Sequence, residues 1–153
     1  MEEIKVEMAD FKISGEPVNL VATAIGSCVA VCFFDPTSKI GGLAHVMLPY
    51  SEKSNIFNPL RFANLAIEEM TNQFVEKGLT LSRLETKIVG GANLFPMLLK
   101  NDEEQMGYRN VQAVKKILSQ MGIRLIAEHT GGSFGRSVKL SLETGIVTVE
   151  IKI

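Results

Sequence analysis

The chain has 153 residues, of which 46% are hydrophobic and 22% charged, so it is long enough for one domain with a sizeable core. Its net charge of −1 offers no basic surface, which argues against nucleic-acid binding. The charged start of the chain lacks a signal-peptide core, and no apolar run reaches the ~20 residues that span a membrane. We therefore expect a cytoplasmic protein without direct membrane insertion.

The first part of the chain predicts strands that lead to a cysteine. Hydrophobic and charged residues alternate over residues 4–8, which is typical of a half-buried strand. A turn at Gly15-Glu16-Pro17 follows, and the apolar residues 18–25 predict another strand. The chain then reaches Gly26-Ser27-Cys28, where a turn places the thiol at the start of the next apolar run.

The next two apolar runs, residues 29–34 and 42–48, predict antiparallel strands joined by a tight turn. Residues 35–38 have aspartate and proline at the positions that a type I turn favours. A two-residue turn there places Cys28 directly opposite His45 on one face, with Cβ atoms roughly 4.5–5.5 Å apart. A bulge in the second strand is the alternative, and it would shift this register by one residue.

Helical spacing, strand propensity and turn residues predict the remaining elements. These are a loop over residues 50–58, a helix from Asn58-Pro59 to Gly78, a strand over 84–89, a polar loop over 100–105, a helix that follows 106–110 and ends at Gly122, a strand over 123–128, and a hairpin of strands 138–142 and 146–151. The pattern predicts an α+β fold, a mixed sheet packed under helices, within a single domain over residues 1–153.

Cys28 and Cys32 are the two cysteines, and their spacing argues against a disulfide. Four rises along a strand separate Cα atoms by about 13 Å, whereas a disulfide tolerates at most ~7 Å. Cys28 is then a free thiol, either a small buried side chain or a nucleophile that His45 deprotonates. Cys28, Cys32, His45 and His129 have atoms that can bind zinc, but their spacing in the sequence does not match that of known zinc sites. We therefore predict no metal and no cofactor.

Two glycine-containing segments each follow a predicted strand. Gly90-Gly91-Ala92-Asn93 and Thr130-Gly131-Gly132 either form tight turns or let backbone amides reach a substrate and stabilise an oxyanion. Arg109 and Arg136 either hold loops through ion pairs or bind a polar substrate.

Five motifs in series give the chain a close resemblance to the CheD family of chemoreceptor glutamine deamidases. They are Gly26-Ser27-Cys28-Val29-Ala30-Val31, Ala44-His45-Val46-Met47-Leu48-Pro49, Gly90-Gly91-Ala92-Asn93, Gly107-Tyr108-Arg109-Asn110, and Thr130-Gly131-Gly132 with Gly135-Arg136. The resemblance implies a mixed β-sheet sandwich flanked by helices, similar to toxin-type glutamine deamidases. It also implies hydrolysis of glutamine side chains on methyl-accepting chemotaxis receptors, with release of ammonia, and the CheC phosphatase as a further partner.

The resemblance also implies which residues form the site. The family's nucleophile falls on Cys28 and its histidine on His45. Its threonine falls on Ala22, while this chain has Thr23 one place later, so we take Thr23 as the third catalytic candidate. His129 stands where a carboxylate is expected. The predicted substrate-binding residues are Ser27, Gly91, Asn93, Arg109 and Gly132.

Three functions remain open at this stage. The leading one is a cysteine-dependent protein-glutamine glutaminase. A cysteine peptidase or small-molecule amidase would use the same thiol and histidine. A non-catalytic adaptor that binds receptors or CheC would not need a reactive Cys28, and the alanine at position 22 keeps that alternative open.

Overall fold

The apolar runs form strands and the two apolar stripes at helical spacing form helices. The computed structural model describes residues 1–53, 55–98, 101 and 105–153. Its elements in chain order are β1 (Glu3–Lys5), β2 (Asp10–Gly15), β3 (Asn19–Ile25), β4 (Val29–Asp35), β5 (Ile40–Val46), a 3₁₀ turn (Pro59–Arg61), α1 (Ala63–Glu76), a second 3₁₀ turn (Leu81–Arg83), β6 (Glu85–Gly90), α2 (Met106–Gln120), β7 (Arg124–Thr130), β8 (Gly135–Ser141) and β9 (Val147–Lys152).

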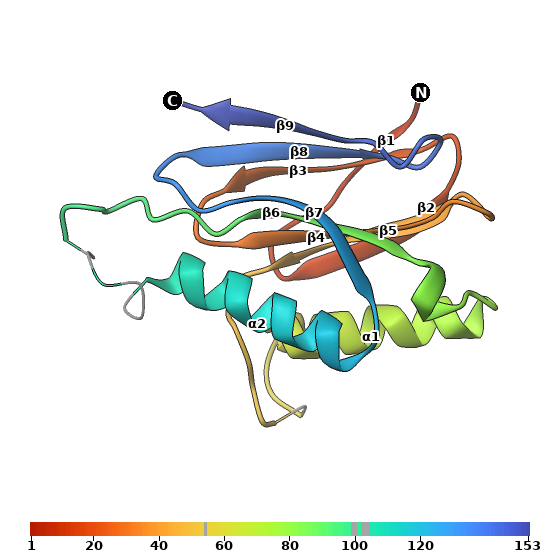
Figure 1. The fold of residues 1–153 in the computed structure, drawn as a ribbon, viewed down its shortest axis with the longest axis horizontal. Coiled ribbons are helices and arrows are strands. Elements are labelled where there is room, and N and C mark those ends of the chain that lie inside the picture. Colours follow the sequence, from red (N-terminus) through yellow and green to blue (C-terminus); the bar gives the residue numbers. More distant parts are fainter. Residues whose placement is uncertain (54, 99–100, 102–104) are drawn as a thin grey trace.

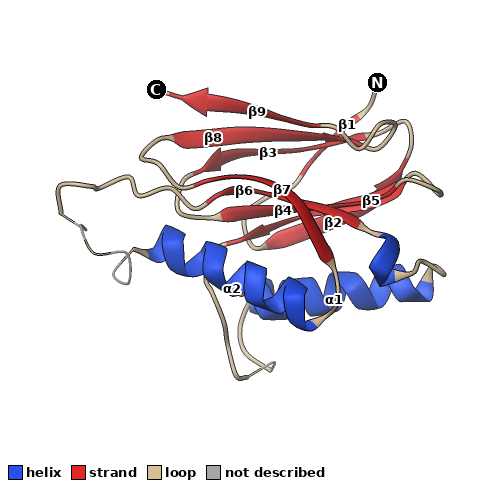
Figure 2. Ribbon diagram, in the orientation of Figure 1, coloured by secondary structure: helices blue, strands red, loops and turns tan. Residues whose placement is uncertain are grey.

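The elements stack as three layers (Figures 1 and 2). A five-stranded sheet of order β2-β5-β4-β6-β7 forms the middle layer. A four-stranded sheet of order β1-β3-β8-β9 lies on one of its faces, and α1 and α2 lie on the other. Each sheet contains one parallel pair, β6–β7 and β1–β3, among antiparallel pairs. The expected α+β fold with mixed sheets is therefore confirmed, with both helices on one side.

Strand β4 explains why the middle layer is apolar on both faces. All seven of its residues are buried, and alternate side chains enter different cores. Val29, Val31 and Phe33 pack toward the helices, where Phe33 meets Phe74 edge-to-face at 5.6 Å between ring centroids. The other set packs between the two sheets and continues, one residue before β4, to Cys28: Cys28, Ala30, Cys32 and Phe34.

The hairpin between β4 and β5 has a longer turn than the sequence analysis predicted. Asp35 pairs with Ile40, so four residues form the loop, and Ala30 pairs with His45. The predicted register, with Cys28 opposite His45, is wrong by two positions. Because side chains alternate with a period of two, a shift of two keeps Cys28 and His45 on the same face, whereas a shift of one would have separated them.

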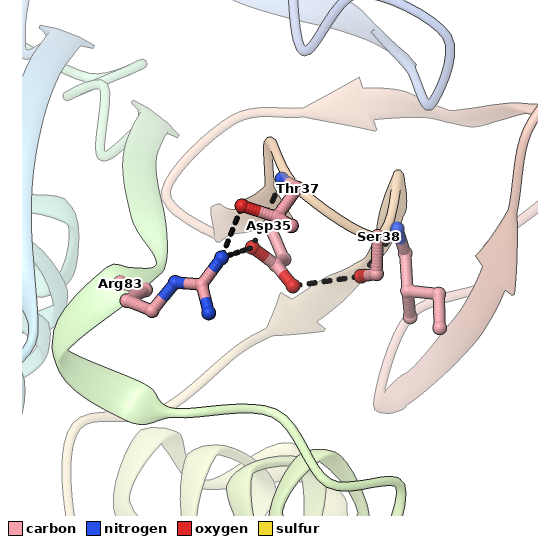
Figure 3. A network of polar contacts seen from close by, with 5 residues as sticks. Asp35, Thr37, Ser38 and Arg83 are labelled. Atoms are coloured by element: carbon pink, nitrogen blue, oxygen red, sulfur yellow. Dashed lines mark hydrogen bonds and ion pairs between the residues drawn. The ribbon is translucent and has the colours of Figure 1, made fainter.

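Buried Asp35 determines this loop (Figure 3). Its carboxylate accepts hydrogen bonds from the Thr37 backbone N–H at 3.2 Å and the Ser38 hydroxyl at 2.7 Å. Arg83 lies beside the same carboxylate at 4.0 Å and donates to the Thr37 hydroxyl. Lys39 closes the loop with a positive φ of 60° and donates its N–H to the Asp35 carbonyl. The turn therefore begins at Asp35-Pro36, as predicted, but it ends at Lys39, which is in the left-handed conformation.

Other boundaries differ locally from the predictions. The first strand, β1, ends at Lys5 and not at residue 8. The chain then turns at Ala9, where φ is 60°, and continues as β2. The sequence analysis did not predict β2. Pro59 begins only a single 3₁₀ turn, and α1 starts at Ala63. Most of the loop predicted over residues 100–105 lies outside the described residues.

Candidate functional site

Cys28 lies between a bend at Gly26-Ser27 and the first residue of β4. Its carbonyl accepts a hydrogen bond from the Gly91 N–H at 2.8 Å, and the Gly26 carbonyl accepts one from Ala92 at 2.9 Å. The chain after β6 therefore lies along the bend and fixes it. Cys28 is 9% exposed, so the thiol is at the edge of the inter-sheet core rather than on the open surface.

His45 lies on the same face of the middle sheet, in the neighbouring strand β5. It is directly opposite Ala30, and Cys28 precedes the first pair of this ladder, Val29 with Val46, by one residue. His45 is 2% exposed, and among the residues that the structure describes neither of its ring nitrogens has a hydrogen-bond partner. An imidazole with unpaired nitrogens can accept a proton.

Burial sets the charge state of both groups. Desolvation raises the pKa of the Cys28 thiol, and the residue's own N–H opposes this shift. Desolvation lowers the pKa of His45, and the backbone of Val6 and the charge of Glu7 oppose that shift. Near neutral pH the resting site therefore holds a thiol and a neutral imidazole rather than an ion pair. The structure places both groups on one face of the middle sheet, and among the described residues no hydrogen bond joins the His45 ring to Cys28.

The second cysteine does not have these properties. Cys32 is 1% exposed, and burial raises its pKa to about 12, although Lys87 acts in the opposite direction. Both cysteines are free. A thiol that is inaccessible and remains protonated is not a nucleophile, so only Cys28 is a candidate.

Close packing accounts for three glycines, which are the last residue of β6, the residue directly after it, and one in the first turn of α2. A Cβ atom on Gly90, where φ is +126°, would lie 2.3 Å from the Cys28 carbonyl oxygen. A Cβ atom on Gly91 would lie 2.3 Å from Val111, and one on Gly107 would lie 2.5 Å from the Ala92 carbonyl oxygen. The N–H of Gly91 pairs with the Cys28 carbonyl and the residue packs against Val111 and Gly107, while substrate binding by Gly91 stays a prediction.

A cavity of about 190 Å³ lies beside the Cys28 peptide. Ser27 and Asn93, two of the predicted substrate-binding residues, line it together with Leu94 and Phe95. The Asn93 carbonyl oxygen Oδ1 accepts a hydrogen bond from the Phe95 N–H at 3.0 Å, which shapes this loop. Neither Cys28 nor His45 is among the residues that line this cavity, and neither lines the larger hollows of about 350 and 450 Å³ along α1.

Thr23 lies away from Cys28. A register shift between Ala22 and Ile25, with a positive φ of 57° at Ala24, interrupts the pairing of β3 with β8. Before this shift Ala22 is buried in the inter-sheet core, while Thr23 is exposed and lines a hollow on the outer face beside Lys139. The structure therefore does not bring Thr23 to the thiol, and the inward-facing side chain at position 22 has no hydroxyl.

The remaining predicted residues have different surroundings. Arg109 is exposed on α2, and Gly132 is exposed while its carbonyl accepts the Asn93 N–H at 2.9 Å. Neither lines the cavity beside Ser27.

Arg136 holds loops together, as one of the two alternatives predicted, but through hydrogen bonds rather than an ion pair. It is buried and donates to the carbonyls of Gly90 at 3.3 Å and Gly131 at 2.8 Å, and to Nδ1 of His129 at 2.9 Å. An Nδ1 that accepts a hydrogen bond is unprotonated, so His129 supplies an acceptor where a carboxylate was expected.

The sequence analysis missed one polar side chain, Asn110. It is fully buried on α2, and its amide nitrogen donates to the carbonyls of Ser27 at 2.9 Å and Met47 at 3.0 Å. A signal was available in the sequence, because Asn110 continues the helical stripe of Val114 and Leu118 by one turn, where an apolar residue is the usual choice.

No three histidine, cysteine or acidic side chains within the described ranges are grouped so that they could hold a metal ion. The same part of the chain has no helix that combines the length and hydrophobicity of a membrane span.

Comparison with known proteins identifies the family. The family model described as CheD, chemotactic sensory transduction, matches residues 47–151. The chain belongs to the CheD family.

Three similar relatives carry the name probable chemoreceptor glutamine deamidase CheD. The protein of Clostridium novyi (strain NT) is 40% identical over 97% of this chain and 92% of its own. That of Desulforamulus reducens is 41% identical over 96% and 89%, and that of Methanococcus maripaludis is 39% identical over 95% and 93%. The resemblance seen in the sequence is thus confirmed over nearly the whole chain.

A solved structure shares the fold of this CheD family member. The hypothetical protein YfiH of Bacillus licheniformis superposes with a TM-score of 0.53 at 14% identity, over 86% of this chain and 60% of that one. At this identity the likeness concerns the α+β fold alone.

Proposed function

We propose that this protein hydrolyses glutamine side chains of methyl-accepting chemotaxis receptors to glutamate, and that it does so in the cytoplasm. Relatives that are named chemoreceptor glutamine deamidases and match nearly the whole chain support the reaction. The observation that supports a cysteine mechanism is the placement of Cys28 and His45 on one face of the middle sheet, with Ser27, the residue before Cys28, lining a cavity.

In the proposed first half-reaction, the Cys28 sulfur attacks the side-chain amide carbon of glutamine. His45 takes the thiol proton and gives it to the departing nitrogen, so that ammonia leaves and a thioester remains. The oxyanion that forms in between needs hydrogen-bond donors. The N–H of Cys28 is the donor we propose, because the N–H of Gly91 is already paired.

In the second half-reaction, water attacks the thioester. His45 takes a proton from the water and returns it to the sulfur as the carbon–sulfur bond breaks, which releases glutamate and restores the thiol. The receptor backbone stays intact because the glutamine side chain alone enters the cavity lined by Ser27 and Asn93. No cofactor takes part in this scheme.

The test uses a receptor fragment and mass spectrometry of its glutamines. We expect wild type and Cys32→Ala, the matched control at the buried cysteine, to convert specific glutamines to glutamate. Cys28→Ala should convert none, and His45→Gln should be at least about 100-fold slower, because general acid–base catalysis is lost. Conversion by Cys28→Ala would overturn the cysteine mechanism. Cleavage of the receptor backbone would indicate a peptidase instead.

A non-catalytic adaptor is the second candidate, favoured by the missing hydroxyl at Ala22 and by the raised pKa of Cys28. It predicts receptor binding without glutamate formation, and binding unchanged in Cys28→Ala. Competition by a CheC phosphatase for the receptor-binding surface stays a prediction, which a pull-down with the purified phosphatase would check.

A further inference from the structure

The side chain of Asn110 connects the two strands that carry Cys28 and His45. The Ser27 carbonyl belongs to the peptide that precedes Cys28, and Met47 follows His45 by two residues. One amide nitrogen reaches both carbonyls, and it has two hydrogens to donate. Helix α2 thereby fixes the entrance to β4 relative to the end of β5.

The geometry of the peptide unit carries this contact to the sulfur. The Ser27 carbonyl and the Cys28 N–H belong to one planar trans peptide, in which they point in opposite directions. A carbonyl held toward α2 at 2.9 Å therefore directs the N–H away from the helix. Burial raises the pKa of the Cys28 thiol and the backbone N–H of the same residue opposes that shift, so the direction of this N–H bears on the thiolate.

Packing alone does not explain an amide at this position. Asn110 lies on the apolar face of α2 among Val111, Val114 and Leu118, where a leucine of similar size would bury only hydrocarbon. In the described part of the structure its Oδ1 atom is buried without a partner, so the amide is not fully satisfied. The amide therefore differs from a leucine in one useful respect, which is that its nitrogen donates two hydrogen bonds.

We propose that Asn110 is a positioning residue, which orients the Ser27–Cys28 peptide so that its N–H faces the reacting sulfur and keeps Cys28 in register with His45. The effect on turnover rests on the proposed function, whereas the effect on the thiol does not.

The experiment compares Asn110→Leu, which is neutral and similar in size, with Gln112→Leu, which removes an exposed amide two residues along the same helix. The rate of Cys28 alkylation by iodoacetamide is measured against pH, with the labelled peptide identified by mass spectrometry. The values of kcat and KM are measured on the receptor fragment. Thermal melts identify which variants are folded.

For Asn110→Leu we expect the alkylation profile to move to higher pH by about one unit, because the thiolate loses its oriented N–H. We expect kcat to fall about 100-fold with KM within about twofold, as when one oxyanion donor is lost. Gln112→Leu should match wild type in both. A folded Asn110→Leu with the wild-type profile and kcat overturns the inference. If that variant does not fold, Asn110→Ser replaces it under the same criteria.

The two readouts separate this inference from the proposed function. A shifted alkylation profile in a protein that deamidates no receptor supports the role of Asn110 and rejects the reaction. Wild-type deamidation with an unchanged Asn110→Leu rejects the role of Asn110 alone.

Discussion

At the scale of single residues, the site is defined by two groups that are kept uncharged. A thiol that titrates above its ordinary range and an imidazole that titrates below it do not form a stable ion pair at rest. In the proposed mechanism, Cys28 becomes a nucleophile only while His45 accepts its proton, so the rate would depend on the distance between them. This is why the residues that hold the two strands in register matter as much as the two groups themselves.

The lowered pKa of His45 makes stability depend on pH. The unfolded chain protonates this histidine as the pH falls below about 6.5, whereas the folded protein keeps it neutral to lower pH, so acid favours unfolding. We expect wild type to lose about 1 kcal/mol more stability than His45→Gln between pH 7.5 and 5.5. Urea unfolding at each pH measures this difference.

The comparison has an internal control. Above pH 7.5 neither state of the protein binds a proton at this site, so the stability difference between wild type and His45→Gln should stay constant there. Equal losses in both proteins on acidification would mean that His45 does not keep its neutral form in the fold.

At the scale of elements, the end of β6 supports the site through a backbone that only glycine adopts. Gly90→Ala would bring a methyl group to 2.3 Å from the Cys28 carbonyl oxygen and 2.7 Å from Ile25, at a φ of +126°. We expect a loss of about 3 kcal/mol in the free energy of unfolding, since strain and overpacking add. Alkylation of Cys28 should also change, because its carbonyl has to move.

Gly78→Ala is the matched control for this substitution. Gly78 also has a positive φ, of +86°, but no atom lies within 4 Å of an added Cβ. Only the backbone strain of a left-handed residue applies there, about 1 kcal/mol. Equal losses in the two variants, measured by urea unfolding, would show that the contact with Cys28 is not tight.

Sequence patterns predicted most of these elements, because β4 is a continuous apolar run and the two helices have apolar residues at helical spacing; the start of α1 was predicted too early, since Pro59 begins a separate 3₁₀ turn. Strand β2 was missed, since its apolar side chains Phe11 and Ile13 are half-buried on an edge strand and separated by a lysine. The hairpin register was missed because the loop ends at Lys39 in a left-handed conformation, which lysine rarely adopts. The contacts of the folded protein, and not the local sequence, determine the backbone conformation of such a residue.

The candidate site was predicted in part for a similar reason. The pattern that placed Cys28 and His45 on one face depends only on alternation, which tolerates an error of two positions. The surroundings of Thr23 depend on a shift in pairing that no spacing rule reveals. The hydrogen bonds of Asn110 join residues that are 83 and 63 positions apart in the chain, so only the assembled layers bring them together.

At the scale of the whole molecule, one sheet serves two cores. The helical core includes Phe74, the inter-sheet core includes Leu20, and β4 contributes to both. We expect Phe74→Ala and Leu20→Ala each to lower stability by about 3–4 kcal/mol and to unfold in one transition. Far-UV circular dichroism follows the helices, and labelling of buried Cys32 follows the inter-sheet core.

The two probes should give the same midpoint in each variant, with an unchanged dependence on urea. A helical signal that disappears before Cys32 becomes reactive would show that the layers unfold separately, and it would argue against a single cooperative domain.

The neutral resting state of Cys28 has a consequence for the lifetime of the enzyme in a cell. Peroxides and electrophilic metabolites react with thiolates far faster than with thiols. In the proposed mechanism, a nucleophile that ionises only during attack on a bound amide spends little time in the vulnerable form. Burial keeps Cys28 protonated when no substrate is bound, so it slows the reaction of this sulfur with electrophiles. For the same reason it protects the sulfur from irreversible oxidation between turnovers.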